Sequence, residues 1–227
     1  MSAPQLPPLP ARPGNLTDLV LAALQRAIIE QQLPPGQQVS EASLADSLQV
    51  SKTPVREALL RLRHIGLVET ADRGLRVTMP SASRTRYAYE LRAGLERSAA
   101  TLAAERCSDA ELVTVAEAAQ NSLEHALHGD ADGFRACDLA FHQSVCEAAR
   151  NPLLEQAVRD ALLLTGALRA RDVPISGDSV GCAREHLAVS DALAERDGHA
   201  AGRAMYAHVQ HVMRIVLDAL GEPDADG

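Results

Sequence analysis

Two sharp breaks divide the first eighty residues, and they constrain the fold more than any other feature of the sequence. Leu33-Pro34-Pro35-Gly36 ends one helical segment, because proline cannot continue the helical hydrogen-bond ladder, and Gly66 ends another. Before the first break, apolar residues recur at the i, i+3, i+4, i+7 spacing of a helix that begins after Asn15, a suitable N-cap. These residues are Leu16, Leu19, Val20, Ala23, Leu24, Ala27 and Ile28.

Between the breaks the sequence predicts two shorter helices. Ser40 is suited to cap the first of them, and either Ser51 or Thr53 caps the second, with Pro54 in its first turn. After Gly66, the strand-like runs 67–70 and 75–79 enclose a turn, which indicates a hairpin. Three helices and a hairpin predict a winged helix-turn-helix over residues 15–79, with the third helix as the recognition helix.

Beyond Pro80 almost every segment has the pattern of an amphipathic helix. The predicted helices are 82–106, 109–128, 131–149, 152–170, 180–196 and 199–219, separated by Gly129, Asn151-Pro152, the 173–177 stretch and Gly198. Short connections between long helices predict an antiparallel bundle of about six helices over residues 80–220, so the protein as a whole is mainly α. We expect residues 1–14 to be a flexible leader and 221–227 a disordered tail.

Charge is distributed unevenly along the chain. The net charge is −8, yet residues 1–80 contain eight basic and seven acidic residues, which leaves 14 basic and 23 acidic residues for the remainder. The near-neutral N-terminal part can present a basic face to DNA, whereas the acidic part is repelled by phosphates. The sequence has no apolar run of about 20 residues and no secretory signal, so we expect a cytoplasmic protein.

Four residues in the helical part have the types and spacing of a metal site. Asp138 and His142 are four residues apart on one predicted helix, so both side chains project from the same face. His186 lies on the fifth helix of the bundle and His208 on the sixth, 22 residues later. Bundles build metal sites from side chains on facing helices, although an isolated buried histidine is more often a core residue than a ligand.

Several motifs resemble the GntR family of bacterial regulators. They are Leu33-Pro-Pro-Gly36, Ser40-Glu41-x-x-Leu44-Ala45, Val50-Ser-Lys-Thr-Pro-Val-Arg-Glu-Ala-Leu59 and Gly66-Leu-Val68. The resemblance extends over the whole chain, because the part after Pro80 is similar to the all-helical FCD effector domain of the FadR-type branch. It implies a DNA-binding transcriptional regulator that forms a homodimer on a pseudo-palindromic operator.

The resemblance also implies which residues contact double-stranded DNA. Lys52 and Arg56 are the candidates for base edges, while Ser51 and Thr53 would donate to phosphates at the start of the recognition helix. Arg73 and Gly74 would lie at the wing tip. The family often has arginine at the positions of Lys52 and Ala42, so the operator sequence is not carried over. Alternatively, Arg56, Arg61 and Arg63 form only a solvated helix face.

In the helical part, the resemblance implies a metal-dependent sensor. Metal-binding domains of this type carry an Asp-x-x-x-His before an Asn-Pro break and two further histidines on the last two helices, which matches Asp138, His142, His186 and His208. The ion would be zinc, nickel or manganese, and a carboxylate of a small organic or sugar acid would complete its coordination. Arg92 either pairs with a second oxyanion of this effector or forms a salt bridge with Glu96.

Three functions are compatible with these observations. The first is a ligand-responsive repressor that senses a small acid through the metal. The second is a metal-dependent hydrolase-like bundle fused to a DNA-binding domain, with a metal-bound water as nucleophile. The third is a structural metal in a bundle that only dimerises.

Overall fold

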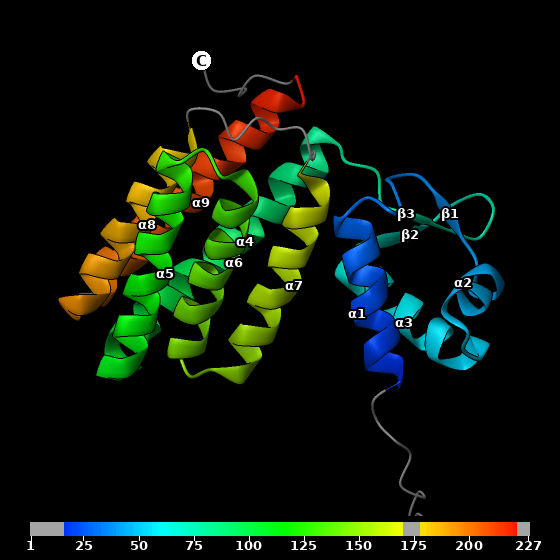
Figure 1. Ribbon diagram of the computed structural model, residues 1–227, viewed down its shortest axis with the longest axis horizontal. Helices are drawn as coiled ribbons and strands as arrows, with labels where there is room; N and C mark the ends of the chain where they lie inside the picture. The colour runs from blue at the N-terminus through cyan, green and yellow to red at the C-terminus, as the bar shows by residue number, and fades with distance from the viewer. Residues whose placement is uncertain (1–15, 170–177, 222–227) are drawn as a thin grey trace, which may run out of the picture. The chain divides into compact units, whose positions relative to one another are not determined.

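The computed structural model describes residues 16–169 and 178–221, and the chain divides into two compact units between Thr78 and Met79 (Figure 1). The expected leader 1–14, the Asn15 cap, the break at 173–177 and residues 222–227 of the expected tail lie outside the described residues.

The first unit is a winged helix-turn-helix, as predicted. It contains α1 (Leu16–Ile29), β1 (Gln38–Val39), α2 (Glu41–Leu48), α3 (Lys52–Ile65), β2 (Val68–Thr70) and β3 (Leu75–Val77). The apolar stripe of α1 buries Val20, Leu24 and Ile28, and α1 packs against α3. Helix α3 buries Val55 and Leu62, so its opposite face is exposed to solvent.

A three-stranded antiparallel sheet forms the wing, in the order β1-β3-β2 (Figure 1). The hairpin of β2 and β3 was predicted, but β1 was not, because two residues carry no periodicity and Gln38 pairs with the distant Arg76. Gly74 lies at the hairpin turn with φ +75°, a left-handed conformation that favours glycine. Its carbonyl accepts a hydrogen bond from the Ala71 N–H at 3.0 Å.

The ends of α3 are set by local residues. Ser51 occupies the N-cap position, although its side chain makes no capping hydrogen bond, and Thr53 lies inside the helix. Gly66 ends the helix with φ 94°, and its N–H donates to the carbonyl oxygens of Leu62 and Arg63. The helix therefore begins shortly after α2, and in its first turn Lys52 and Thr53 are exposed whereas Pro54 and Val55 are buried.

In its described part, the second unit contains six helices that run side by side (Figure 1). They are α4 (Ala82–Arg106), α5 (Asp109–Leu127), α6 (Ala131–Ala148), α7 (Pro152–Leu168), α8 (Asp178–Ala194) and α9 (Gly198–Ala219). Helix α4 packs against α6, α7, α8 and α9, and α5 packs against α6 and α8. The bundle predicted from periodicity is therefore confirmed, with α4 at its centre.

Small residues allow α4 and α9 to lie close together. The buried face of α4 is rich in alanine, including Ala93, Ala100 and Ala103. A Cβ atom added at Gly202 of α9 would lie 2.4 Å from Thr101 Oγ1 and 3.1 Å from the Arg97 carbonyl oxygen, so a larger residue would force these neighbours to shift. Within the described ranges, none of the helices combines the length and apolar character needed to cross a membrane.

Candidate functional site

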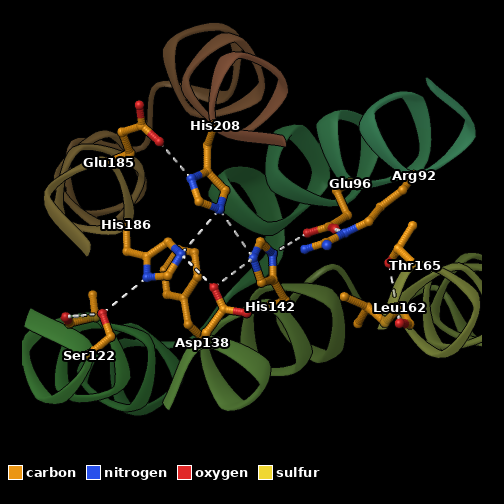
Figure 2. Close-up of polar contacts among 12 residues, drawn as sticks. Arg92, Glu96, Ser122, Asp138, His142, Leu162, Thr165, Glu185, His186 and His208 are labelled. Atoms are coloured by element: carbon orange, nitrogen blue, oxygen red, sulfur yellow. Dashed lines mark hydrogen bonds and ion pairs between the residues drawn. The ribbon is translucent and has the colours of Figure 1, made fainter. Parts of the chain in front are cut away.

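The bundle brings Asp138, His142, His186 and His208 together in its interior (Figure 2). One potential ligand atom from each lies within 4.8 Å of the others. The Nε2 atoms of His186 and His208 are 3.2 Å apart, and those of His208 and His142 are 3.3 Å apart. Asp138 Oδ1 lies 3.4 Å from His186 Nε2 and 3.8 Å from His142 Nε2. The three imidazoles are buried, whereas the Asp138 side chain is 20% exposed.

Two carboxylates hold the outer nitrogens of two of these rings (Figure 2). Glu96 of α4 hydrogen-bonds to Nδ1 of His142, and Glu185 Oε2 of α8 lies 2.8 Å from Nδ1 of His208. An ionised carboxylate only accepts hydrogen bonds, so Nδ1 carries the proton in both rings. In a neutral ring this leaves the lone pair on Nε2, and the Nε2 atoms of His142 and His208 face each other at the centre of the site.

Ser122 of α5 imposes the same tautomer on the third ring. Its hydroxyl donates to the Ala119 carbonyl oxygen at 2.7 Å, and His186 Nδ1 lies 3.0 Å from the same Oγ. A hydroxyl has one proton to donate, so Ser122 accepts from the His186 Nδ1–H. The His186 ring also stacks on Phe141, with 4.2 Å between the ring centroids. Hydrogen bonding and stacking together direct the His186 Nε2 lone pair to the same point.

Three converging lone pairs and a carboxylate have the geometry of a cation site. Nitrogen atoms that approach to 3.2–3.3 Å with no proton between them repel each other unless a cation lies among them. Ligand bonds of about 2.0–2.1 Å place neighbouring ligand atoms about 2.9 Å apart at a right angle and about 3.4 Å apart in a tetrahedron. The residues therefore fit one divalent ion with mixed nitrogen and oxygen ligands, such as zinc, nickel or manganese.

The protonation states favour the same chemistry. Burial lowers the pKa of His208 to about 3 and also lowers the pKa of His186, so both rings are neutral near pH 7. Burial by itself would raise the pKa of Asp138, but its contact with the His186 ring, together with the neighbouring His142 and Arg169, holds the pKa well below its usual value. A deprotonated carboxylate beside neutral imidazoles is the ligand set that a divalent ion requires.

Arg92 and Glu96 form a buried salt bridge next to this cluster (Figure 2). Arg92 Nε donates to Glu96 Oε1 at 2.5 Å, and the other carboxylate oxygen of Glu96 accepts from His142. Burial would raise the pKa of Glu96, but Arg92 and His142 lower it to about 2. Of the two alternatives for Arg92, the salt bridge is thus present in this structure, and it connects Arg92 to a candidate metal ligand.

The sequence did not reveal the residues that hold the imidazoles. Glu96 was considered only as a partner of Arg92, and nothing in the sequence distinguishes Ser122 or Glu185 from ordinary helix residues. Glu185 Oε1 also lies 2.9 Å from Nδ1 of His211, which extends the polar network one residue further. These partners come from α4, α5 and α8, so only the packing of the bundle brings them to the site.

The predicted DNA-contacting residues lie on two exposed elements of the first unit. Ser51, Lys52, Thr53 and Arg56 are exposed in the first turns of α3 and just before it, and Arg73 and Gly74 are exposed at the wing tip. Among the residues that the structure describes, α3 makes two exposed salt bridges, Arg61 Nη1–Asp18 Oδ1 at 2.8 Å and Arg56 Nη2–Glu41 Oε2 at 2.7 Å. The first agrees with a solvated role for Arg61, and the second joins α3 to the start of α2.

Comparison with known proteins identifies the class of protein to which this chain belongs. Residues 16–75 match the gntR family of bacterial regulatory proteins and residues 87–211 match the FCD domain. The "Nta operon transcriptional regulator" of Aminobacter aminovorans is 31% identical over 196 residues, covering 83% of this chain and 90% of that protein. The "HTH-type transcriptional repressor RspR" of Escherichia coli (strain K12) is 26% identical and covers 91% and 90%.

A solved structure shares the fold. E. coli McbR/YncC superposes with a TM-score of 0.77 at 20% identity, covering 91% of this chain and 99% of that one. The fold and these matches define a DNA-binding transcriptional regulator. More particularly, the chain belongs to the GntR family and carries an FCD domain. The family and its relatives are regulators rather than enzymes, so the hydrolase alternative is set aside.

Proposed function

We propose that this regulator is a homodimeric repressor that releases or binds its operator in response to a small organic or sugar acid. The acid would be held at a divalent metal ion bound by Asp138, His142, His186 and His208. One observation carries the proposal. Hydrogen bonds at Nδ1 leave three buried Nε2 lone pairs facing one another and a carboxylate, an arrangement that a cation stabilises.

The chain's own residues have distinct roles in this proposal. The three imidazoles are at most 1% exposed, whereas Asp138 is 20% exposed, so the ligand would approach on the Asp138 side. The metal, when bound, would supply a Lewis-acidic centre for a carboxylate oxygen. Arg92, on the neighbouring α4, would interact with a second oxyanion of the ligand. Glu96 links this guanidinium to His142, so ligand binding and metal binding would influence each other.

At the DNA, residues 15–79 would read one half of a pseudo-palindromic operator, and residues 80–220 would dimerise and sense the acid. Lys52 and Arg56 would contact base edges, and Ser51 and Thr53 would donate to phosphates. Arg73 and Gly74 would approach the backbone or minor groove through the wing. The E. coli relative RspR is a transcriptional repressor by name, which supports this direction of regulation, and action on DNA corresponds to a cytoplasmic location.

The first test identifies what the native protein carries. Elemental analysis of purified full-length protein should find about one divalent ion per chain, and native mass spectrometry should detect any small acid that co-purifies. A matched titration then measures operator affinity of metal-loaded protein with a panel of organic and sugar acids. Operator affinity that stays the same with every acid, with and without metal, would remove the sensor role.

A variant at Asp138 distinguishes a sensory metal from a purely structural one. Asp138→Ala should abolish the response of operator binding to the acid, because it removes the candidate ligand on the side from which the acid would approach. If this variant has a lower melting temperature but keeps the full response, the metal serves only the stability of the bundle. In a dimer, the two DNA-binding units would adopt either an arrangement that fits the operator or one that does not. An acid can change operator affinity only by as much as its own affinity differs between these two arrangements.

A further inference from the structure

The exposed Arg56 of the recognition helix is held by a carboxylate from the preceding helix. Glu41 is the first residue of α2, and Arg56 lies in the second turn of α3. Arg56 Nε lies 2.9 and 3.0 Å from the two oxygens of Glu41, and Arg56 Nη2 lies 2.7 Å from Oε2. The pair joins the two helices of the helix-turn-helix, which is more than a local contact on one helix surface.

The geometry of this pair leaves the outer end of the guanidinium free. Glu41 occupies the edge formed by Nε and one N–H of Nη2. A guanidinium has five N–H donors, so two on Nη1 and one on Nη2 remain. Within the ranges that the structure describes, those three make no hydrogen bond to another side chain, and the Arg56 side chain is 62% exposed. The free Nη1–Nη2 fork matches the paired O6 and N7 acceptors of guanine.

Both partners are charged under ordinary conditions. The hydrogen bond from Arg56 lowers the pKa of Glu41, and the hydrogen bond to Glu41 raises the pKa of Arg56. Ser40 caps the start of α2 through a hydrogen bond from the Ser43 N–H at 3.1 Å, so the backbone that carries Glu41 is also well defined. The carboxylate is therefore a charged support for Arg56 on a capped helix end.

We infer that Glu41 is a positioning residue, which orients the guanidinium of Arg56 so that its free fork recognises one guanine in the operator. This inference rests on the proposed docking of α3 in the major groove. An unsupported arginine side chain samples many rotamers and can contact phosphates as readily as bases. Support from Glu41 restricts it to one plane and opposes its use as a general phosphate contact.

The carboxylate has a second, opposite effect. Its negative charge near the DNA repels phosphates, so Glu41 lowers affinity for every sequence to some extent. Positioning and repulsion therefore predict different results when the charge is removed. Loss of positioning reduces discrimination at one base pair, whereas loss of repulsion raises affinity for all sequences equally. The comparison of specific with non-specific DNA distinguishes the two effects.

The test uses the full-length protein and a duplex selected by it from random-core DNA. Affinities of wild type, Arg56→Ala and Glu41→Gln are measured for the selected duplex, all its single-base-pair variants and an unrelated duplex. Arg56→Ala identifies the base pair at which its discrimination is lost, by about 5- to 150-fold for a bidentate contact. Glu41→Gln should lose much of the discrimination at that same base pair and keep it elsewhere.

Asp18→Asn is the matched control, because it breaks the other exposed salt bridge of α3, with Arg61, and should leave every discrimination ratio unchanged. Thermal melts of Glu41→Gln and wild type are compared to check that the variant is folded. Unchanged discrimination in Glu41→Gln, or an equal gain in affinity for all duplexes, would overturn the positioning role while leaving the docking intact. If Arg56→Ala itself binds and discriminates like wild type, the docking and the inference both fail.

Discussion

Replacement of Ser122 by alanine tests whether hydrogen bonds at Nδ1 prepare the cluster for a metal. Ser122 is fully buried, donates to Ala119 at 2.7 Å and accepts from His186 Nδ1 at 3.0 Å. Without this acceptor, the buried Nδ1–H of His186 is unpaired at a cost of about 1–3 kcal/mol. The ring can avoid that cost by moving its proton to Nε2, which removes the lone pair from the centre of the site.

Either outcome weakens metal binding. Loss of a hydrogen-bond partner behind a metal-bound histidine typically lowers affinity about 10- to 100-fold. This corresponds to about 1.4–2.8 kcal/mol of binding free energy. We expect Ser122→Ala to show a loss of this size for Zn²⁺, measured by titration of chelator-stripped protein against a competing chromogenic chelator. Thermal melts of the stripped protein report the separate cost to folding.

Ser144→Ala is the control. Ser144 is partly buried on α6, and its hydroxyl also donates to a backbone carbonyl, that of Phe141 at 2.8 Å. It lacks the second contact that Ser122 makes with a histidine, so its Zn²⁺ affinity should equal that of wild type. The reasoning is refuted if Ser122→Ala binds Zn²⁺ as tightly as wild type, or if both serine variants lose affinity equally.

Four further perturbations test other parts of the molecule. Zn²⁺ at 100 times its Kd should stabilise wild type by about 2.7 kcal/mol in thermal melts, and Asp138→Ala should lose most of that gain. Burial lowers the pKa of His208 to about 3, whereas an unfolded histidine titrates near 6.5, so the unfolded chain binds the proton first. Metal-free wild type should therefore lose stability as pH falls below about 6.5, by up to about 1.4 kcal/mol per pH unit, and melts of His208→Gln should depend less on pH. Lys52→Ala should weaken operator binding by about 1–3 kcal/mol if Lys52 contacts a base, and equal weakening on all sequences would instead indicate a phosphate contact. Ser108→Ala removes the capping box with Glu111 and should cost about 1 kcal/mol in denaturant unfolding, and an unchanged midpoint would show that this cap is dispensable.

The helices were predictable because their signals are local. Ser81, Ser108, Asp130, Asn151 and Asp197 each accept a hydrogen bond from a backbone N–H three residues later, and each stands immediately before a helix. Caps of this kind and 3.6-residue periodicity are both readable from a short window of sequence. Strand β1 was missed for the opposite reason, since its two residues become a strand only by pairing with β3.

The candidate metal ligands were only partly predictable. The spacing of Asp138 and His142 places both on one helix face, but nothing local relates them to His186 and His208. Resemblance to a family supplied that relation, and the packing of α6, α8 and α9 brings the four ligand atoms within 4.8 Å of one another. The recognition helix shows the same limit, because its exposed cations were evident but the contact between Arg56 and Glu41 was not.

The sequence by itself determined the architecture of this protein, a winged helix-turn-helix followed by a helical bundle. It also placed the ends of most helices within two residues of where the structure has them. Only the tertiary structure decided which nitrogen of each histidine in the site carries the proton. Glu96, Ser122 and Glu185 come from three helices and assign the Nδ1 protons of His142, His186 and His208. A tautomer depends on the acceptor that lies within hydrogen-bond distance, and that distance is set by how helices remote in sequence pack together.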